Sequence, residues 1–136
     1  MSVTFLHTAD LHLGSQLKTQ HRGSTQAADE LDSAMYTAVE RLFDVALAED
    51  VDFVIVAGDL YDEDSRSVKA NAFLSRQFGR LAAEDIPAYV SYGNHDPVGT
   101  ATTYVDLPDN VHEFDHEEPE EFLYPNSDTP EARIWG

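Results

Sequence analysis

The segment that decides the fold is FVIVAGDLYD, which runs from Phe53 to Asp62. Its opening residues are apolar and rich in β-branched side chains, a composition typical of a strand buried on both faces of a sheet. Gly58 and Asp59 follow this run directly. We therefore expect a buried strand whose carboxyl end carries an acidic side chain.

The same arrangement occurs twice more along the chain. The run Val3–Leu6 precedes Asp10 and His12, and the run Ala88–Tyr92 precedes the tetrad GNHD at 93–96. In an open α/β sheet, ligands bind in the crevice beyond the carboxyl ends of the strands. All three polar blocks are expected at that edge of the sheet, and Gly58 and Gly93 should let the backbone turn sharply just before Asp59 and Asn94.

Helical spacing of apolar residues separates the three predicted strands. The first helix is expected to start at about residues 25–29 and to end near Glu49, and the second to start at about Ser65 or Ser67 and to end before Pro87. The order β-α-β-α-β predicts an α/β fold with parallel strands joined by right-handed crossovers.

The pattern is weaker in the last third of the chain. We expect a loop at 97–103, a short strand at 111–114 and one more strand at 132–136. The stretch 117–130 holds three prolines and five acidic residues, so no regular element is expected there. Residues 1–136 are interpreted as a single domain that is truncated on its carboxyl side.

The charge is extreme for a chain of 136 residues, with 26 acidic against 8 basic residues and a net charge of -18. Such a surface repels itself until salt screens it, which suggests a halophilic source; an ordinary acidic protein is the alternative. The chain has no basic footprint, which argues against a module that binds DNA by charge alone. A nuclease whose metal ions meet the phosphate directly is not excluded.

The composition also limits the compartment and the metal chemistry. Without cysteine, neither disulfides nor thiolate sites can form, so manganese, magnesium, iron or zinc held by oxygen and nitrogen is favoured. The chain does not open like a signal peptide, and its apolar runs are too short to cross a bilayer. We therefore expect a cytoplasmic protein that does not enter membranes.

The polar blocks suit a site for two divalent ions. Such a site holds its ions about 3.5–4 Å apart with one carboxylate between them. Asp59 is the natural bridge, Asp10 and His12 can reach one ion, and Asn94 offers an amide oxygen to the other. His95 is then a proton donor for the leaving oxygen, and Asp62 or Asp96 could fix its tautomer.

Each block alone has a plainer interpretation. Asp-x-His is a common tripeptide, and a Gly-Asp pair after a strand is usually a simple turn. The GNHD tetrad is more specific, because an Asn-His pair is a poor choice for ordinary turn chemistry. Three such blocks in order, each after a strand, are hard to explain as chance.

Together the blocks resemble the signature of the calcineurin-like metallophosphoesterase superfamily, which reads Asp-x-His, then Gly-Asp-x-x-Asp, then Gly-Asn-His-Asp or Glu. Within it, the segments Phe5–Gly14, Ala57–Asp62 and Gly93–Pro97 are most similar to DNA repair exonucleases of the SbcD and Mre type. The resemblance implies a layered fold, with this chain forming the amino-terminal half of a sheet sandwich flanked by helices.

The resemblance also implies roles for single residues. Asp10 and His12 would bind the first metal ion, Asp59 would bridge, and Asn94 would bind the second. His95 would act on the phosphate or leaving group, and Asp62 would orient His95. The ions would be two divalent cations, with Mn²⁺ favoured over Mg²⁺, Fe²⁺ or Zn²⁺. The implied partners are DNA, an SMC-like ATPase and a second copy of the chain.

The chain departs from the family in one respect. Members carry three further ligands, a lone His and a Gly-His-x-His pair, and the only histidines after Asp96 are His112 and His116, which are four residues apart. We interpret both as solvated surface residues. We therefore expect weak metal binding and little catalysis from this chain alone, and self-association through exposed apolar surface.

The leading functional hypothesis is a metal-dependent exonuclease that acts on DNA ends. One alternative is another branch of the superfamily, such as a small-molecule phosphodiesterase or a phosphatase. A third is a non-catalytic module for dimerisation or docking. The retained ligands argue against pure scaffolding, since a scaffold has no need to keep Asp10, His12, Asp59 and Asn94 together.

Overall fold

A four-stranded parallel sheet forms the centre of the fold. The computed structural model describes residues 2–14, 25–61, 68–93, 107–115 and 117–136. The strands are β1 Phe5–Ala9, β2 Phe53–Ala57, β3 Ala88–Ser91 and β4 Val111–Glu113, in the order β1-β2-β3-β4. The predicted parallel α/β fold is confirmed, and so is the short strand expected at 111–114.

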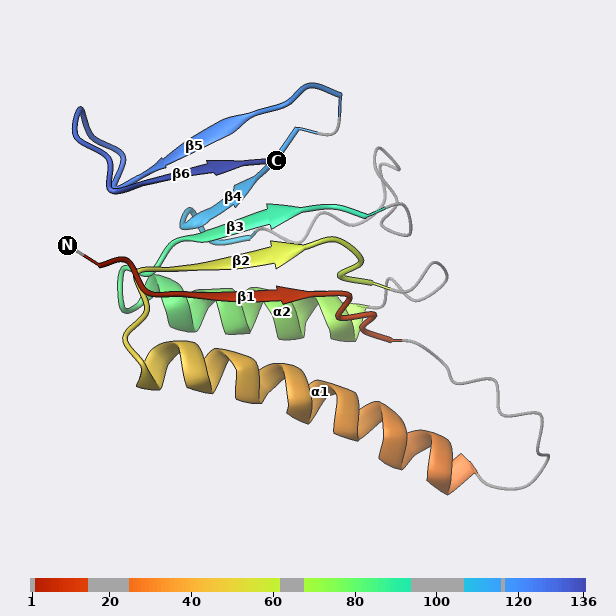
Figure 1. The fold of residues 1–136 in the computed structure, drawn as a ribbon. Coiled ribbons are helices and arrows are strands. Elements are labelled where there is room, and N and C mark those ends of the chain that lie inside the picture. Colours follow the sequence, from red (N-terminus) through yellow and green to blue (C-terminus); the bar gives the residue numbers. More distant parts are fainter. Residues whose placement is uncertain (1, 15–24, 62–67, 94–106, 116) are drawn as a thin grey trace.

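Two helices cover one face of this sheet (Figure 1): α1, Thr25–Ala48, and α2, Val68–Ala82. Both follow the predicted pattern, although the expected start of α2 at Ser65 or Ser67 lies outside the described residues. Among the residues that the structure describes, no helix combines the length and the apolar character that crossing a membrane requires.

The two faces of the sheet belong to different apolar cores. Val54 and Val56 are 2% and 0% exposed and pack with the helices, because alternate side chains of a strand point to the same face. Phe53 and Ile55 belong to the second core. Strand β2 is therefore buried on both faces, as the sequence of the FVIVA segment predicts.

A hairpin covers the second face. It consists of β5, Glu121–Tyr124, and β6, Ala132–Trp135, which pair antiparallel. Figure 1 shows it on the side of the sheet away from the helices. Phe122 of β5 packs against Phe114, with ring centroids 4.9 Å apart, and Ile134 of β6 is buried in the same core.

The expectation of no regular element in 117–130 is wrong, because β5 lies within it. The prolines of this stretch flank the strand instead of interrupting it. The aromatic side chains Phe122 and Tyr124 find partners on the central sheet, and this packing overrides the local breaker signals. The strand expected at 132–136 is confirmed as β6.

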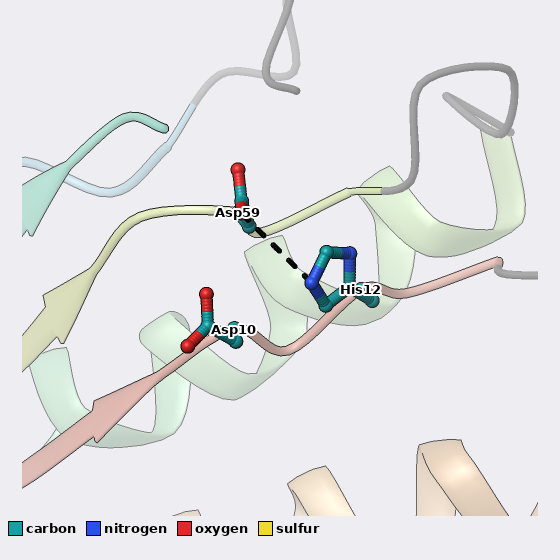
Figure 2. Close-up of side chains that lie close together, drawn as sticks. All are labelled: Asp10, His12 and Asp59. Carbon is teal, nitrogen blue, oxygen red and sulfur yellow. Dashed lines mark ion pairs between the residues drawn. The ribbon is translucent and has the colours of Figure 1, made fainter. Parts of the chain in front are cut away.

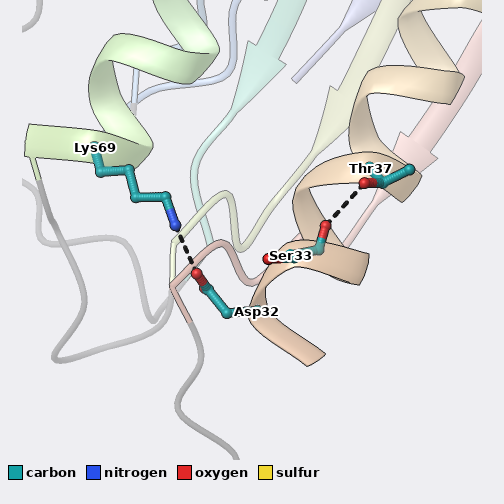
Figure 3. A network of polar contacts seen from close by, with 4 residues as sticks. All are labelled: Asp32, Ser33, Thr37 and Lys69. Carbon is teal, nitrogen blue, oxygen red and sulfur yellow. Dashed lines mark hydrogen bonds and ion pairs between the residues drawn. The ribbon is translucent and has the colours of Figure 1, made fainter. Parts of the chain in front are cut away.

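Two ion pairs join the helices. The Lys69 Nζ atom lies 2.6 Å from Asp32 Oδ2 (Figure 3), and an Arg80 guanidinium nitrogen lies 2.6 Å from Asp44 Oδ1. Both pairs are open to solvent, so each stabilises the fold by about 1 kcal/mol or less. Packing, not charge, holds the helices to the sheet.

Aspartates with positive φ end both helices. Asp50 has φ 48° and follows α1, and Asp85 has φ 56° and follows α2. In each case the next residue closes the helix, since Val51 N donates to Ala46 O at 3.2 Å and Ile86 N donates to Leu81 O at 3.0 Å. The two helices therefore end in the same way, with an aspartate of positive φ followed by a backbone hydrogen bond that closes the last turn.

We predict that the protein loses stability above pH 10 because of Tyr89, which is buried, and Tyr124, which is partly buried. Burial and the nearby Asp52 carboxylate raise the pKa of Tyr124, whose hydroxyl donates to Asp52 Oδ1 at 3.3 Å. Burial also raises the pKa of Tyr89. A folded pKa above the unfolded value of about 10 gives stability that is present below that pH and is lost as the pH rises through the folded pKa.

The measurement is the free energy of unfolding in urea between pH 8 and 11. Tyr124→Phe should lower stability by about 0.5–1 kcal/mol at pH 8, through loss of the hydrogen bond, and should flatten the fall above pH 10. An unchanged slope in this variant would contradict the assignment.

Candidate metal centre

The segments that follow β1 and β2 stay paired beyond the ends of the strands. Asp10 N donates to Gly58 O at 3.3 Å, His12 N to Asp59 O at 2.9 Å, and Leu13 N to Leu60 O at 3.0 Å. Leu13 and Leu60 are 0% and 2% exposed, so they anchor both segments in the core. The backbone that carries the predicted ligands is therefore fixed on both sides.

This backbone holds an unusual conformation at every predicted ligand that is described. Asp10, His12 and Asp59 have φ of 53°, 44° and 45°, and Gly58 between the strand and Asp59 has φ 74°. A non-glycine residue with positive φ destabilises the folded state by about 1–2 kcal/mol, and packing elsewhere must offset this cost. The other non-glycine residues with positive φ among those described are the two helix caps. Strain gathered at polar residues points to a functional site.

The three side chains converge at the carboxyl edge of the sheet. Each offers one ligand atom, and these atoms all lie within 4.8 Å of one another. His12 Nε2 is 3.9 Å from Asp59 Oδ2. Figure 2 shows Asp10 and His12 on the segment after β1, facing Asp59 on the segment after β2.

The group fits a divalent metal ion. Two carboxylates and an imidazole form a donor set that Mn²⁺, Fe²⁺ and Zn²⁺ accept. Asp59 is largely shielded, with 15% of its side chain exposed, whereas His12 is 37% exposed and Asp10 lies at the surface. One side of the group is thus open to a substrate.

Two glycines shape the site in different ways. The sequence suggests that Gly58 and Gly93 both allow a sharp turn, and this holds for Gly58 with its positive φ. Gly93 instead provides space, because a Cβ atom there would overlap the Asp59 carboxylate and lie 2.7 Å from Asp59 N. Sequence reasoning missed this role; the signal was a glycine at the end of the strand next to β2.

The other predicted site residues cannot be compared with the structure. Asn94, His95, Asp62 and Asp96 lie outside the described residues, so their roles remain predictions. The structure therefore brings together Asp10, His12 and Asp59 of the predicted set.

The interpretation of His112 as a solvated residue is wrong. Its ring is partly buried, with centroids 5.2 Å from Tyr89 and 5.3 Å from Phe122. It lies on β4, whose register pairs it with Tyr89 within the sheet, away from the metal group. His116 lies outside the described residues.

Comparison with known proteins points to one family. The calcineurin-like phosphoesterase family matches residues 3–135. An uncharacterized metallophosphoesterase of Bacillus subtilis, YhaO, is 39% identical over 134 residues, which cover 98% of this chain and 33% of that protein.

More distant relatives include two proteins named DNA double-strand break repair protein Mre11. Those of Thermoplasma acidophilum and Sulfurisphaera tokodaii are 33% and 35% identical over 91 residues, 67% of this chain and 22% and 21% of theirs. The chain thus spans about a third or less of the length of these relatives. With nearly its whole length matched, and with Asp10, His12 and Asp59 of the signature gathered at the carboxyl edge of the sheet, the chain belongs to the calcineurin-like phosphoesterase family.

Proposed function

We propose that the protein hydrolyses phosphodiester bonds with the help of divalent metal ions, and that its substrate is DNA, attacked from its ends. The observation that carries this proposal is the convergence of Asp10, His12 and Asp59, whose ligand atoms lie within 4.8 Å of one another. The group sits on fixed backbone and is open on one side.

The proposed roles follow from what each side chain can donate. Asp10 and His12 would hold one ion, Asp59 would be a ligand shared by both ions, and Asn94 would supply an amide oxygen to the second. When bound, two such ions, with Mn²⁺ favoured, stabilise both the attacking and the leaving oxygen of an in-line displacement. His95 gives its proton to the leaving oxygen, and Asp62 keeps its imidazole in the donating tautomer.

Two observations support DNA as the substrate. The Mre11 relatives are named for DNA double-strand break repair and match over two thirds of this chain. Leu13-Gly14 after the first block and Pro97 after the third also match the nuclease branch. The net charge of -18 opposes DNA binding by charge. Contact with the phosphate therefore rests on the metal ions.

The second candidate is a small-molecule phosphodiesterase or a phosphatase of the same family. The name of the YhaO relative gives no substrate, so its 39% identity supports this candidate as well as the first. A non-catalytic docking module is less favoured, because strained backbone at three ligands has no use in a scaffold.

The remaining proposals concern the setting of the protein. We propose a cytoplasmic location, a halophilic source, and association with an SMC-like ATPase or a second copy. Exposed apolar side chains such as Phe5 and Trp135, 51% and 66% exposed, support self-association.

The test combines metal binding with hydrolysis. Electron paramagnetic resonance measures Mn²⁺ binding. Hydrolysis is measured in high salt with two substrates, bis-p-nitrophenyl phosphate and linear duplex DNA. Asp59→Asn should weaken Mn²⁺ binding by about tenfold or more and lower any hydrolysis by about 100-fold. Asn tolerates positive φ, so the fold should persist.

Asp50→Asn is the matched control, because it makes the same exchange at a residue that also has positive φ, at the end of α1. It should behave like the wild-type protein. Mn²⁺ binding that survives Asp59→Asn would overturn the site. The assay uses this chain and, where the gene continues, the complete gene product. If both hydrolyse the small diester and neither cleaves DNA, the second candidate is favoured.

A further inference from the structure

An aromatic cleft lies at the end of the sheet opposite the metal group. It has a volume of about 580 Å³ and is bounded by the residues that precede and begin β3 and β4 and by β5. The side chains that matter are Tyr89, His112, Phe122, Tyr124, Asp85 and Glu121. This volume suits a small ligand or a single long side chain.

The rings form a continuous surface. The His112 ring lies nearly parallel to that of Tyr89, with an interplanar angle of 23°, and Phe122 contacts both, at centroid distances of 5.5 and 5.3 Å. Tyr89 is 3% exposed and lies beneath, whereas His112, Phe122 and Tyr124 keep part of their surface exposed. The faces of aromatic rings attract cations.

The charged side chains that line the cleft are all acidic among the described residues. Asp85 and Glu121 line it, and no lysine or arginine does so among the described residues. Glu121 is engaged by Arg133 at 2.8 Å, but Asp85 has no basic partner within the part of the chain that is described. Grooves for single-stranded nucleic acid combine rings with basic residues, so this cleft does not suit a nucleic acid.

A buried, unused hydrogen-bond acceptor belongs to one of the residues that line the cleft. Asn110 donates through Nδ2 to Ile86 O at 2.8 Å, and it lines the cleft. Its Oδ1 atom is buried and accepts no hydrogen bond from any described residue. A buried acceptor without a donor is rare, and a ligand that carries N–H groups would satisfy it after a small movement.

We propose that this cleft binds an organic cation of the guanidinium type. The ring faces and Asp85 supply the attraction for a weakly hydrated positive charge. The carboxylate oxygen of Glu121 that Arg133 does not hold, and Asn110 Oδ1 after a small movement, supply acceptors for planar N–H donors. The site is independent of the metal group and of the function proposed for it.

The test is titration of the intact chain with four probes, monitored by nuclear magnetic resonance. N-acetyl-arginine amide represents an arginine within a protein, and methylguanidine represents a free small molecule. Tetramethylammonium is a cation without N–H donors, and N-acetyl-citrulline amide is the uncharged isostere of the first probe. Both guanidinium probes should bind with dissociation constants of about millimolar. The tighter of the two indicates the source.

Two variants locate the site, and a third is the control. Asp85→Asn should weaken binding of the tighter probe about threefold, and Phe122→Leu about threefold or more. Asp50→Asn makes the same charge change at the matched cap of α1, outside the cleft, and should leave binding unchanged. Circular dichroism shows whether the Phe122→Leu variant is folded. If this variant is unfolded, Asp85→Asn still tests the proposal.

Several results would overturn the proposal. Citrulline amide binding as tightly as arginine amide would exclude recognition of charge. Tetramethylammonium binding as tightly would exclude the guanidinium assignment. Equal weakening by Asp85→Asn and Asp50→Asn would show that only overall charge acts.

Discussion

Gly93→Ala is expected to weaken metal binding at the Asp10, His12 and Asp59 group without unfolding the protein. An added Cβ atom at this position would overlap the Asp59 carboxylate and would lie 2.8 Å from Asp59 Cγ. The carboxylate has to move away. The added atom would also lie 2.7 Å from Asp59 N, so it presses on a backbone that the hydrogen bond from His12 N to Asp59 O holds at 2.9 Å. We expect Mn²⁺ affinity to fall at least about tenfold and any phosphodiester hydrolysis about 100-fold.

The matched control is Gly79→Ala. Gly79 lies within α2, and an added Cβ atom there meets nothing within 4 Å. This variant should bind Mn²⁺ like the wild-type protein and gain about 0.5–1 kcal/mol of stability, since alanine favours a helix over glycine. Electron paramagnetic resonance measures the binding, and thermal unfolding measures the fold. Unchanged Mn²⁺ binding in Gly93→Ala would mean that Asp59 is not a ligand.

The space that Gly93 leaves beside Asp59 is a feature that the sequence alone does not reveal. The strands could be predicted because their runs of branched and aromatic residues reflect burial on both faces, a property that each segment carries locally. The placement of Asp10, His12 and Asp59 at one edge followed from parallel topology alone. The space needed beside Asp59 depends on a neighbouring strand that is distant in sequence, and no local pattern encodes that contact.

The backbone conformation of the ligand residues could not be predicted from the sequence either. Nothing in Asp-x-His indicates that Asp10 and His12 adopt positive φ, because this conformation is imposed by pairing with the segment after β2. The strand β5 was missed for a similar reason, since its prolines dominate the local signal while its aromatic residues act through the central sheet. Long-range packing decides both cases, and it is the part that local propensity cannot supply.

Raising KCl from 0.1 M to 2 M is expected to increase the free energy of unfolding by about 3–6 kcal/mol, because repulsion within a compact chain of net charge -18 is screened. The Debye length falls from about 10 Å at 0.1 M to 3 Å or less above 1 M. Salt also weakens ion pairs such as Lys69 with Asp32 and Arg80 with Asp44. Each of these exposed pairs contributes about 1 kcal/mol or less, so repulsion decides the sign.

A neutralised variant separates charge repulsion from other effects of salt. It replaces four exposed acids that form no ion pair among the described residues with their amides: Glu49, Glu84, Asp109 and Glu118. The net charge becomes -18 plus 4, or about -14, and repulsion scales with the square of this charge, so it falls by about 40%. Urea unfolding at 0.1 M KCl should show the variant to be the more stable protein, whereas at 2 M the two should agree within about 0.5 kcal/mol. Equal stability at 0.1 M would mean that salt acts through burial of apolar surface, and the acidic surface would then give no support for a halophilic source.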